Sequence, residues 1–289
     1  MMNLKKILFT IALTVLFSTT VFSQWTKGKA NGYYKLSAWY LKADQHYTDT
    51  GKTDPNITRN QFNISLYGEY GISNKFDIIT YIPFFSRAVE NDEISGTTGQ
   101  ILSKGEAFNS FGDMEIGVRY GVLKTDKYAL SASLKLGLPT GDNSGGSDGS
   151  FQTGDGEFNQ LLQTNLGTSF AIGSIPSYAK LYLGLNNRTK GFSDEFRTGI
   201  ELGANISKNK LWLIGRADIL KSFQNGSLSA QTSQGSIFAN NIEFVTLGAE
   251  IAYYITKKIG ISLNYTSIVS GKLIYAAPSI SGGIFLDIK

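Results

Sequence analysis

The chain has 289 residues with 27 basic and 23 acidic side chains, a formal net charge of +4 and no cysteine. So small a positive surplus argues against nucleic acid as the main partner, because phosphate binding needs a concentrated basic face. The absence of cysteine excludes disulfides, thiolate nucleophiles and cysteine-ligated zinc.

The first residues have the layout of a secretory signal. Lys5 and Lys6 precede an apolar run over 7–17, and small, hydroxyl-bearing residues follow. This order is typical of a signal peptide, and the run is shorter than the roughly twenty residues of a transmembrane helix. We expect residues 1–23 to be cleaved, leaving one domain at 24–289. The formal net charge then falls from +4 to +2, because both lysines are removed and no acid is.

Period-two alternation dominates the rest of the chain. In the stretch 62–70, Phe62, Ile64 and Leu66 face one way, while Asn63 and Ser65 face the other. Successive side chains of a strand point to opposite faces, and a helical period of 3.6 does not fit these stretches. The pattern predicts about twelve strands: 32–45, 60–71, 76–86, 110–123, 127–138, 158–172, 177–187, 195–207, 210–221, 241–255, 258–268 and 276–288.

The lengths of these strands and of their connections favour a membrane barrel. Most strands are longer than the five or six residues usual in soluble proteins, and a tilted transmembrane strand needs roughly nine to eleven. No stretch after residue 24 is apolar for long enough to form a membrane helix, and in lipid only helices and closed barrels satisfy every backbone polar group. Short connections alternate with longer ones, which are expected at 46–59, 87–109, 139–157, 188–194, 222–240 and 269–275.

This alternation is typical of outer-membrane barrels, which have short periplasmic turns and long external loops. The predicted fold class is therefore all-β, a single closed antiparallel transmembrane β-barrel of about twelve strands in an up-and-down meander. We expect it in a bacterial outer membrane with both termini on the periplasmic side.

The apolar face of each strand should meet lipid, and the polar face should line the lumen. Aromatic residues near the strand ends, such as Tyr33, Tyr34, Trp39 and Tyr40, are interpreted as interfacial belts. Charged lumen side chains either line a permeation path or pair with one another across a narrow interior; we expect pairing with a residual path. The lumen-lining candidates are Glu69, Asp113, Glu115, Arg119, Lys135, Arg197, Glu201, Arg216, Asp218 and Glu250.

No constellation of residues points to an enzyme. His46, the only histidine, lies near the end of the first predicted strand and is expected to be a solvated loop residue without a nucleophile beside it. The glycine-rich acidic stretch 139–149 does not match the spacing of a calcium loop and is expected to be a flexible external loop. We therefore expect no catalytic residue, no cofactor and no metal site.

One hairpin carries a family resemblance. The stretch Phe111–Tyr120, FGDMEIGVRY, is followed by Leu134–Asp142, LKLGLPTGD. In order and spacing, this pair resembles the outer-membrane proteins grouped under the meta-pathway of phenol degradation, whose presumed role is like that of FadL and TodX channels. The resemblance implies a barrel that takes up small apolar or aromatic compounds. Unlike a FadL channel, the chain offers only 24–31 before its first strand, too little for an N-terminal hatch, so any obstruction should come from a loop such as 87–109 or from lumen side chains.

Two functional hypotheses follow. The first is a passive outer-membrane channel for small solutes, with hydrophobic or aromatic compounds among the candidates; the second is a sealed structural or adhesive barrel whose external loops bind a partner. A barrel enzyme acting on lipid ranks last. The expected partners are outer-membrane lipid, the barrel-assembly machinery during insertion and a small-molecule solute, with no nucleic acid.

Overall fold

The structure is a computed structural model that describes residues 26–207, 210–229 and 236–289. The expected signal peptide, 1–23, lies outside these residues. None of the described residues belongs to a helix that could cross a membrane.

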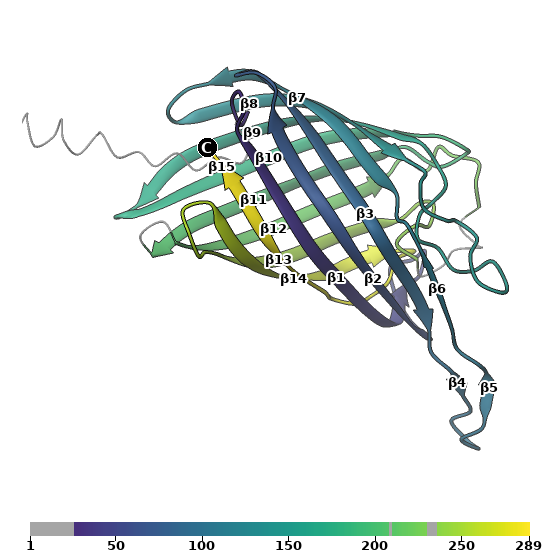
Figure 1. Ribbon diagram of the computed structural model, residues 1–289. Coiled ribbons are helices and arrows are strands. Elements are labelled where there is room, and N and C mark those ends of the chain that lie inside the picture. The colour runs from purple at the N-terminus through teal and green to yellow at the C-terminus, as the bar shows by residue number, and fades with distance from the viewer. Residues whose placement is uncertain (1–25, 208–209, 230–235) are drawn as a thin grey trace, which may run out of the picture.

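Twelve long antiparallel strands form one closed ring (Figure 1). Sequence neighbours pair with one another, and β1 closes the ring by pairing with β15, from Gly32 opposite Ile288 to Leu41 opposite Ser279. The predicted fold class and strand count are confirmed. The strands of the ring are β1 (Gly32–Tyr47), β2 (Thr53–Gly71), β3 (Phe76–Glu90), β7 (Met114–Lys124), β8 (Tyr128–Leu138), β9 (Asn159–Ile172), β10 (Ile175–Arg188), β11 (Glu195–Ser207), β12 (Leu211–Ser222), β13 (Glu243–Tyr254), β14 (Ile259–Lys272) and β15 (Ser279–Ile288).

The long-loop end contains strands that the sequence pattern did not predict. The stretch 87–109 holds β4 (Glu93–Ile94), β5 (Ile101–Ser103) and β6 (Glu106–Ser110). Strand β6 pairs with the outer part of β3, and the β4–β5 hairpin projects away from the barrel (Figure 1). This hairpin therefore does not enter the lumen as an obstruction.

The predicted connection 46–59 is also wrong. Strands β1 and β2 continue to pair beyond the expected boundary, as far as Tyr47 opposite Thr53. Two antiparallel strands can continue to pair through their backbones beyond the part of the barrel that lipid covers. There the outward-facing side chains no longer need to be apolar. The pattern of apolar residues therefore ends before the strands do.

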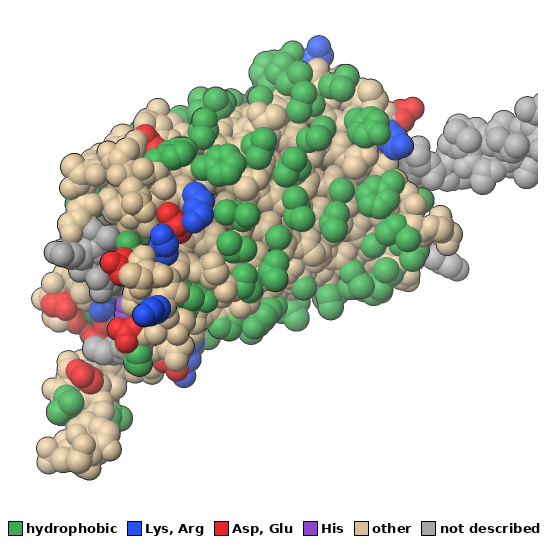
Figure 2. All heavy atoms as spheres, turned by 180° about the vertical axis from the view of Figure 1, so that it is seen from behind, with side chains coloured by type: hydrophobic (Ala, Val, Ile, Leu, Met, Phe, Trp, Pro, Cys, Tyr) green, Lys and Arg blue, Asp and Glu red, His purple; other side chains and the backbone are tan. Residues whose placement is uncertain are grey.

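The outer wall is apolar and the inner wall is polar. On β14, Ile261, Leu263 and Tyr265 are 45%, 59% and 50% exposed, whereas Ser262 between them is buried. Figure 2 shows apolar side chains spread over the middle of the wall and charged ones mostly near its ends. An exposed apolar band around a closed barrel is what a lipid-spanning wall requires.

On β1 the aromatic-belt interpretation holds for two of the four residues named for it. Tyr34 and Tyr40 lie on the outer set of β1, together with exposed Leu36, but Tyr33 and Trp39 lie on the inner set with buried Leu41. Consecutive strand residues cannot face the same side. Two of the four aromatic residues assigned to this belt therefore belong to the interior.

Candidate functional site

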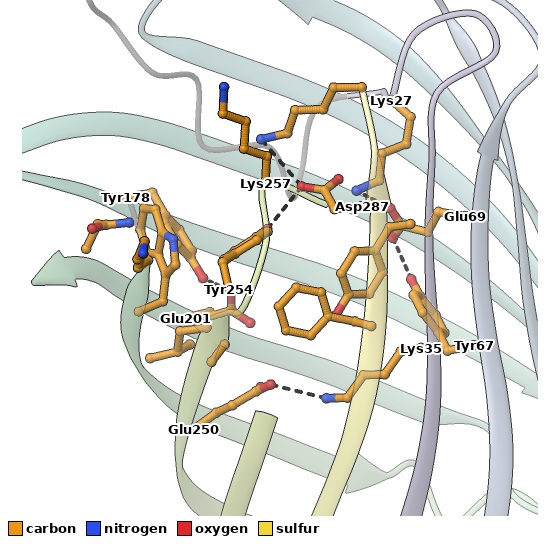
Figure 3. A pocket seen from close by; sticks show the side chains of 18 of the residues that line it. Lys27, Lys35, Tyr67, Glu69, Tyr178, Glu201, Glu250, Tyr254, Lys257 and Asp287 are labelled. Carbon is orange, nitrogen blue, oxygen red and sulfur yellow. Dashed lines mark hydrogen bonds and ion pairs between the residues drawn. The ribbon is translucent and has the colours of Figure 1, made fainter. Parts of the chain in front are cut away.

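A cavity of about 970 Å³ occupies the lumen near the short-turn end (Figure 3). Thr256 and Lys257, in the turn between β13 and β14, lie at its mouth, and Lys35, Arg216 and Glu250 lie at its inner end. Side chains of β1, β2, β10, β11, β12, β13 and β15 line it. The cavity is therefore a vestibule inside the barrel rather than a groove on its surface.

A row of alternating charges forms the inner end of this vestibule. Lys180 on β10 pairs with Glu201 on β11, and Arg216 on β12 bridges Glu201 and Glu250. Lys35 on β1 completes the row by pairing with Glu250 on β13, 3.1 Å away. Within the row three cations accompany two carboxylates, and Asp218, on the same strand as Arg216, also interacts electrostatically with that arginine.

A second network of buried charges lies beside the first. Arg119 on β7 donates to Glu69 on β2 and to Asp77 on β3, with closest N–O separations of 3.0 and 2.8 Å. Lys27 pairs with Glu69 at 3.2 Å, and the Tyr67 hydroxyl donates to the same carboxylate. Two cations balance two acids here, so this network locks the strands together without adding net charge.

Aromatic rings form two walls of the vestibule. On one side Tyr33 stacks on Phe285 with ring centroids 5.6 Å apart, and Tyr254 meets Phe285 edge-on at 4.9 Å. On the other side the rings of Tyr178 and Trp212 lie 5.6 Å apart. Aromatic rings favour offset or edge-to-face partners at these separations, so these rings hold one another in place along the vestibule wall.

The long-loop end of the lumen is filled by packed side chains. Inward-facing Leu41 and Ala43 of β1 are buried against Tyr275 and Ala277, and Ile237 packs on the same cluster. A neighbouring cluster around Leu220, Ala239, Ile242, Leu273 and Ile274 also includes Ile237. Residues 236–242 and 273–277 thus form a plug at this end, which we call the loop plug.

The glycine-rich loop packs against the loop plug. Ser236 donates to the side chain of Gln152 over 3.0 Å, and the Ser150 hydroxyl accepts from Arg59. The Phe151 ring is buried beneath the Arg59 guanidinium. The flexible external loop at 139–149 stays a prediction, whereas its continuation, 150–152, is anchored by these contacts.

Asp113 anchors the two ends of that loop. It lies just outside β7, where one carboxylate oxygen accepts from the backbone N–H of Gly141 and the other from that of Asp155. Asp155 in turn lies 2.8 Å from Arg188. Burial raises the pKa of Asp155 to about 7, with Glu157 and Asp113 adding repulsion and Arg188 opposing the shift.

The ten lumen-lining candidates occupy three places. Glu69, Glu201, Arg216 and Glu250 line the vestibule, with Arg119 directly behind Glu69. Farther along the wall are the pair Glu115–Lys135, Arg197 bound to Glu195, and Asp218, which accepts from Tyr182. Asp113 holds the loop instead.

Sequence reasoning missed several vestibule residues. Lys35 and Lys180 are the cations that accompany Glu250 and Glu201, and Trp212 and Phe285 supply ring faces. Alternation itself carried a signal for Lys35, since it shares the polar face of its strand with Ser37. Which charge it meets across the lumen depends on barrel curvature, which a linear pattern does not contain.

The interpretation of His46 as a solvated loop residue is wrong. His46 lies within β1, is 8% exposed and forms an isolated β-bridge with Tyr275. Its backbone belongs to the extended part of the β1–β2 hairpin and pairs there with Tyr275 of the loop plug.

Comparisons with known proteins bear on the fold. No protein-family model matches the chain, and no curated protein matches it in sequence. An outer membrane channel from Pseudomonas putida F1 aligns with a TM-score of 0.64 and 12% identity over 94% of this chain and 100% of the other. The transport unit of the autotransporter AIDA-I from Escherichia coli aligns with a TM-score of 0.51 and 10% identity, covering 97% of each chain.

The protein is thus an all-β outer-membrane barrel by fold. Its expected location in a bacterial outer membrane is supported by these neighbours and by the apolar outer band described above. Within that class it has a vestibule rich in charged and aromatic side chains and a packed loop plug at the opposite end.

Proposed function

We propose that this barrel is a passive channel for small solutes in a bacterial outer membrane. The observation that carries the proposal is the vestibule of about 970 Å³ inside the lumen, which reaches from the short-turn mouth to Lys35, Arg216 and Glu250. A barrel whose only task is to be rigid has no need of so large an open space inside its wall. Space for a solute is the simpler reason for it.

For a solute to pass through the whole barrel, the loop plug must move out of the lumen. The plug is held by packing of side chains such as Ile237 and by a few hydrogen bonds, including Ser236 to Gln152. Loop segments with this kind of attachment open at lower free energy than the paired strands beneath them. The plug is therefore proposed as the constriction, and the vestibule as the wide part of the path.

The class of solute is also a proposal. The resemblance of residues 110–142 to the phenol meta-pathway family supports small apolar or aromatic compounds, and the ring walls around Tyr33 and Trp212 agree with a flat guest. The similar outer membrane channel from Pseudomonas putida F1 supports a channel of some kind.

The test is conductance of the refolded, full-length protein in planar bilayers, with circular dichroism to establish β-structure. Ala252 lines the vestibule, whereas Ala249 on the same strand is exposed on the outer wall. Ala252→Trp should reduce conductance at least about twofold, because the ring enters the path, and Ala249→Trp should leave it unchanged. Equal effects of the two variants would place the current outside the lumen and would contradict the proposal.

A second candidate function is a sealed barrel whose loops bind a partner. The β4–β5 hairpin favours it, because it projects from the barrel and exposes Ile94, Ile101 and Leu102 by 59%, 56% and 64%. Liposome swelling separates the two candidates. A channel admits small uncharged solutes, whereas a sealed barrel admits none even when Ile237→Ala loosens the loop plug.

A further inference from the structure

We propose that the vestibule is a binding site for small aromatic carboxylates, with Arg216 and Lys35 holding the carboxylate and the ring walls holding the aromatic group. This inference deepens the proposed channel function and rests on it for its purpose, although binding itself can be measured without transport.

The first argument is the charge of the site. Seven cationic side chains and four acidic ones line the vestibule. At its inner end, the row from Lys180 to Lys35 has one cation more than it has carboxylates. A charge left unbalanced in a partly desolvated space favours a ligand of opposite sign, since Coulomb energies grow as water is excluded. An anion satisfies this site better than a neutral hydrocarbon does.

The second argument is the donor geometry. Arg216 uses Nε on Glu201, 2.7 Å away, and Nη1 on Glu250, 2.6 Å away. Its side chain lines the vestibule and is 30% exposed, so part of the guanidinium can be reached from the cavity. Lys35 Nζ uses one donor on Glu250 and has three in all. Both residues line the cavity and both contact Glu250, so an incoming carboxylate at this level can accept from both.

The third argument separates aromatic acids from sugar acids. A sugar acid needs many polar partners for its hydroxyl groups. Three tyrosine hydroxyls of the vestibule are already engaged, because Tyr67 donates to Glu69, Tyr178 to Glu201 and Tyr254 to Asp287. What these three tyrosines still bring to the vestibule is ring surface, and Trp212 adds its own. Ring surface whose hydroxyls are engaged suits a flat, unsaturated body better than a polyhydroxylated one.

The test compares ligands that differ in one property each. Calorimetric titration of the refolded protein in detergent uses benzoate, its neutral isostere benzamide, acetate without a ring, and glucuronate with a saturated polar ring. We expect benzoate to bind at least about tenfold more tightly than any of the other three; tenfold is the factor that 1.4 kcal/mol corresponds to at 25 °C. Equal affinity for benzamide would show that the negative charge of the ligand does not matter for binding. Equal affinity for glucuronate would show that the site does not select an aromatic ring. Either result would contradict the proposal.

A matched pair of variants ties binding to the site. Lys35→Met removes a donor but leaves Glu250 paired with Arg216, so the row becomes electrically neutral. Lys42 lies on the same strand with its side chain on the exposed face. Benzoate affinity should fall about tenfold or more in Lys35→Met and stay within twofold of the parent in Lys42→Met. A similar loss in both variants would show that the overall positive charge of the protein attracts benzoate, and would contradict the proposed binding site.

Failure of this inference can be told apart from failure of the channel. If the barrel conducts and admits neutral solutes but does not bind benzoate, the binding site is wrong and the channel stands. If benzoate binds as expected but no flux is found even with the loop plug loosened, the site stands and the channel is wrong.

Discussion

Lys35 Nζ on β1 lies 3.1 Å from Glu250 Oε1 on β13, although β14 and β15 separate these strands in the sheet. The ion pair therefore reaches across the interior instead of following neighbouring strands, and Arg216 joins it from β12. Because these side chains meet at the inner end of the vestibule, their charges should decide which ions pass that level. Neutralising one of them should change ion selectivity more than it changes stability.

The first prediction concerns selectivity. Glu250→Gln removes one of the two carboxylates in the row, so Lys35 and Arg216 lose part of their compensation. The reversal potential in a potassium chloride gradient should shift toward chloride, with at least a twofold rise in the permeability ratio of chloride to potassium. Glu93→Gln on the projecting hairpin removes the same charge far from the lumen and should shift nothing. An unchanged reversal potential in Glu250→Gln would mean that the charge row does not line the path of the ions.

Alternation along a strand is what led from the sequence to Glu201 and Arg216, and both residues line the vestibule. Glu201 and Arg216 face the lumen because alternation is fixed by the backbone once one face meets lipid. Alternation also rules out a shared face for neighbours such as Tyr33 and Tyr34, so the belt interpretation failed where it followed residue type instead of period. These parts of the interior follow from local rules.

Contacts across the lumen and at the long-loop end cannot be predicted from the alternation of side chains along a strand. Asp113 leaves the inward pattern because the N–H of Gly112 bonds to the carbonyl of Pro83, which sets the backbone apart from β7. The burial of His46 and Tyr275 depends on a hairpin that extends beyond the lipid-facing alternation. Neither feature repeats with a period, so neither has a signal in a single sequence.

The second prediction concerns the loop plug. Ile237 packs on both apolar clusters at the long-loop end, so Ile237→Ala should weaken the plug at two places. We expect longer open times and higher average conductance in planar bilayers, by about threefold or more. Leu228, in the same connection, is 41% exposed, and Leu228→Ala is the matched control that should leave conductance unchanged. A plug that never moves would show no difference between the two variants.

The third prediction concerns stability. Arg119 is 5% exposed and bonds to both Glu69 and Asp77, so Arg119→Met leaves two buried carboxylates with fewer partners. Removing one member of a buried ion pair typically costs about 3–5 kcal/mol, and Lys27, which bonds to both acids, should reduce this loss. Urea unfolding in lipid vesicles should show a drop of about 2 kcal/mol or more. Arg87→Met, at an exposed arginine bound to Asn109, should change the free energy of unfolding by less than about 0.5 kcal/mol.

The fourth prediction is a pH dependence of the glycine-rich loop. Burial raises the pKa of Asp155 to about 7 from an ordinary value of 3.8, while Glu157 and Asp113 repel its charged form and Arg188 attracts it. The packed loop thus binds the proton more tightly than the released loop does. This contribution is fully present below pH 3.8 and is lost as the pH rises through about 7. Raising the pH from 6 to 8.5 should therefore favour release of the loop.

The measurement uses the absence of cysteine from the chain. Thr153 is 5% exposed, so Thr153→Cys should react with a maleimide mainly when the loop is released. Its labelling rate is compared at the two pH values with the rate of the same cysteine in a chain that also carries Asp155→Asn. The intrinsic rise in thiolate with pH is common to both proteins and cancels in the ratio. We expect the chain with Asp155 to show the steeper rise. If the labelling rates of the two chains rise equally with pH, the proton on Asp155 does not control the loop. If the steeper rise disappears when Glu157 and Asp113 are also neutralised, repulsion among the three carboxyl groups causes the effect.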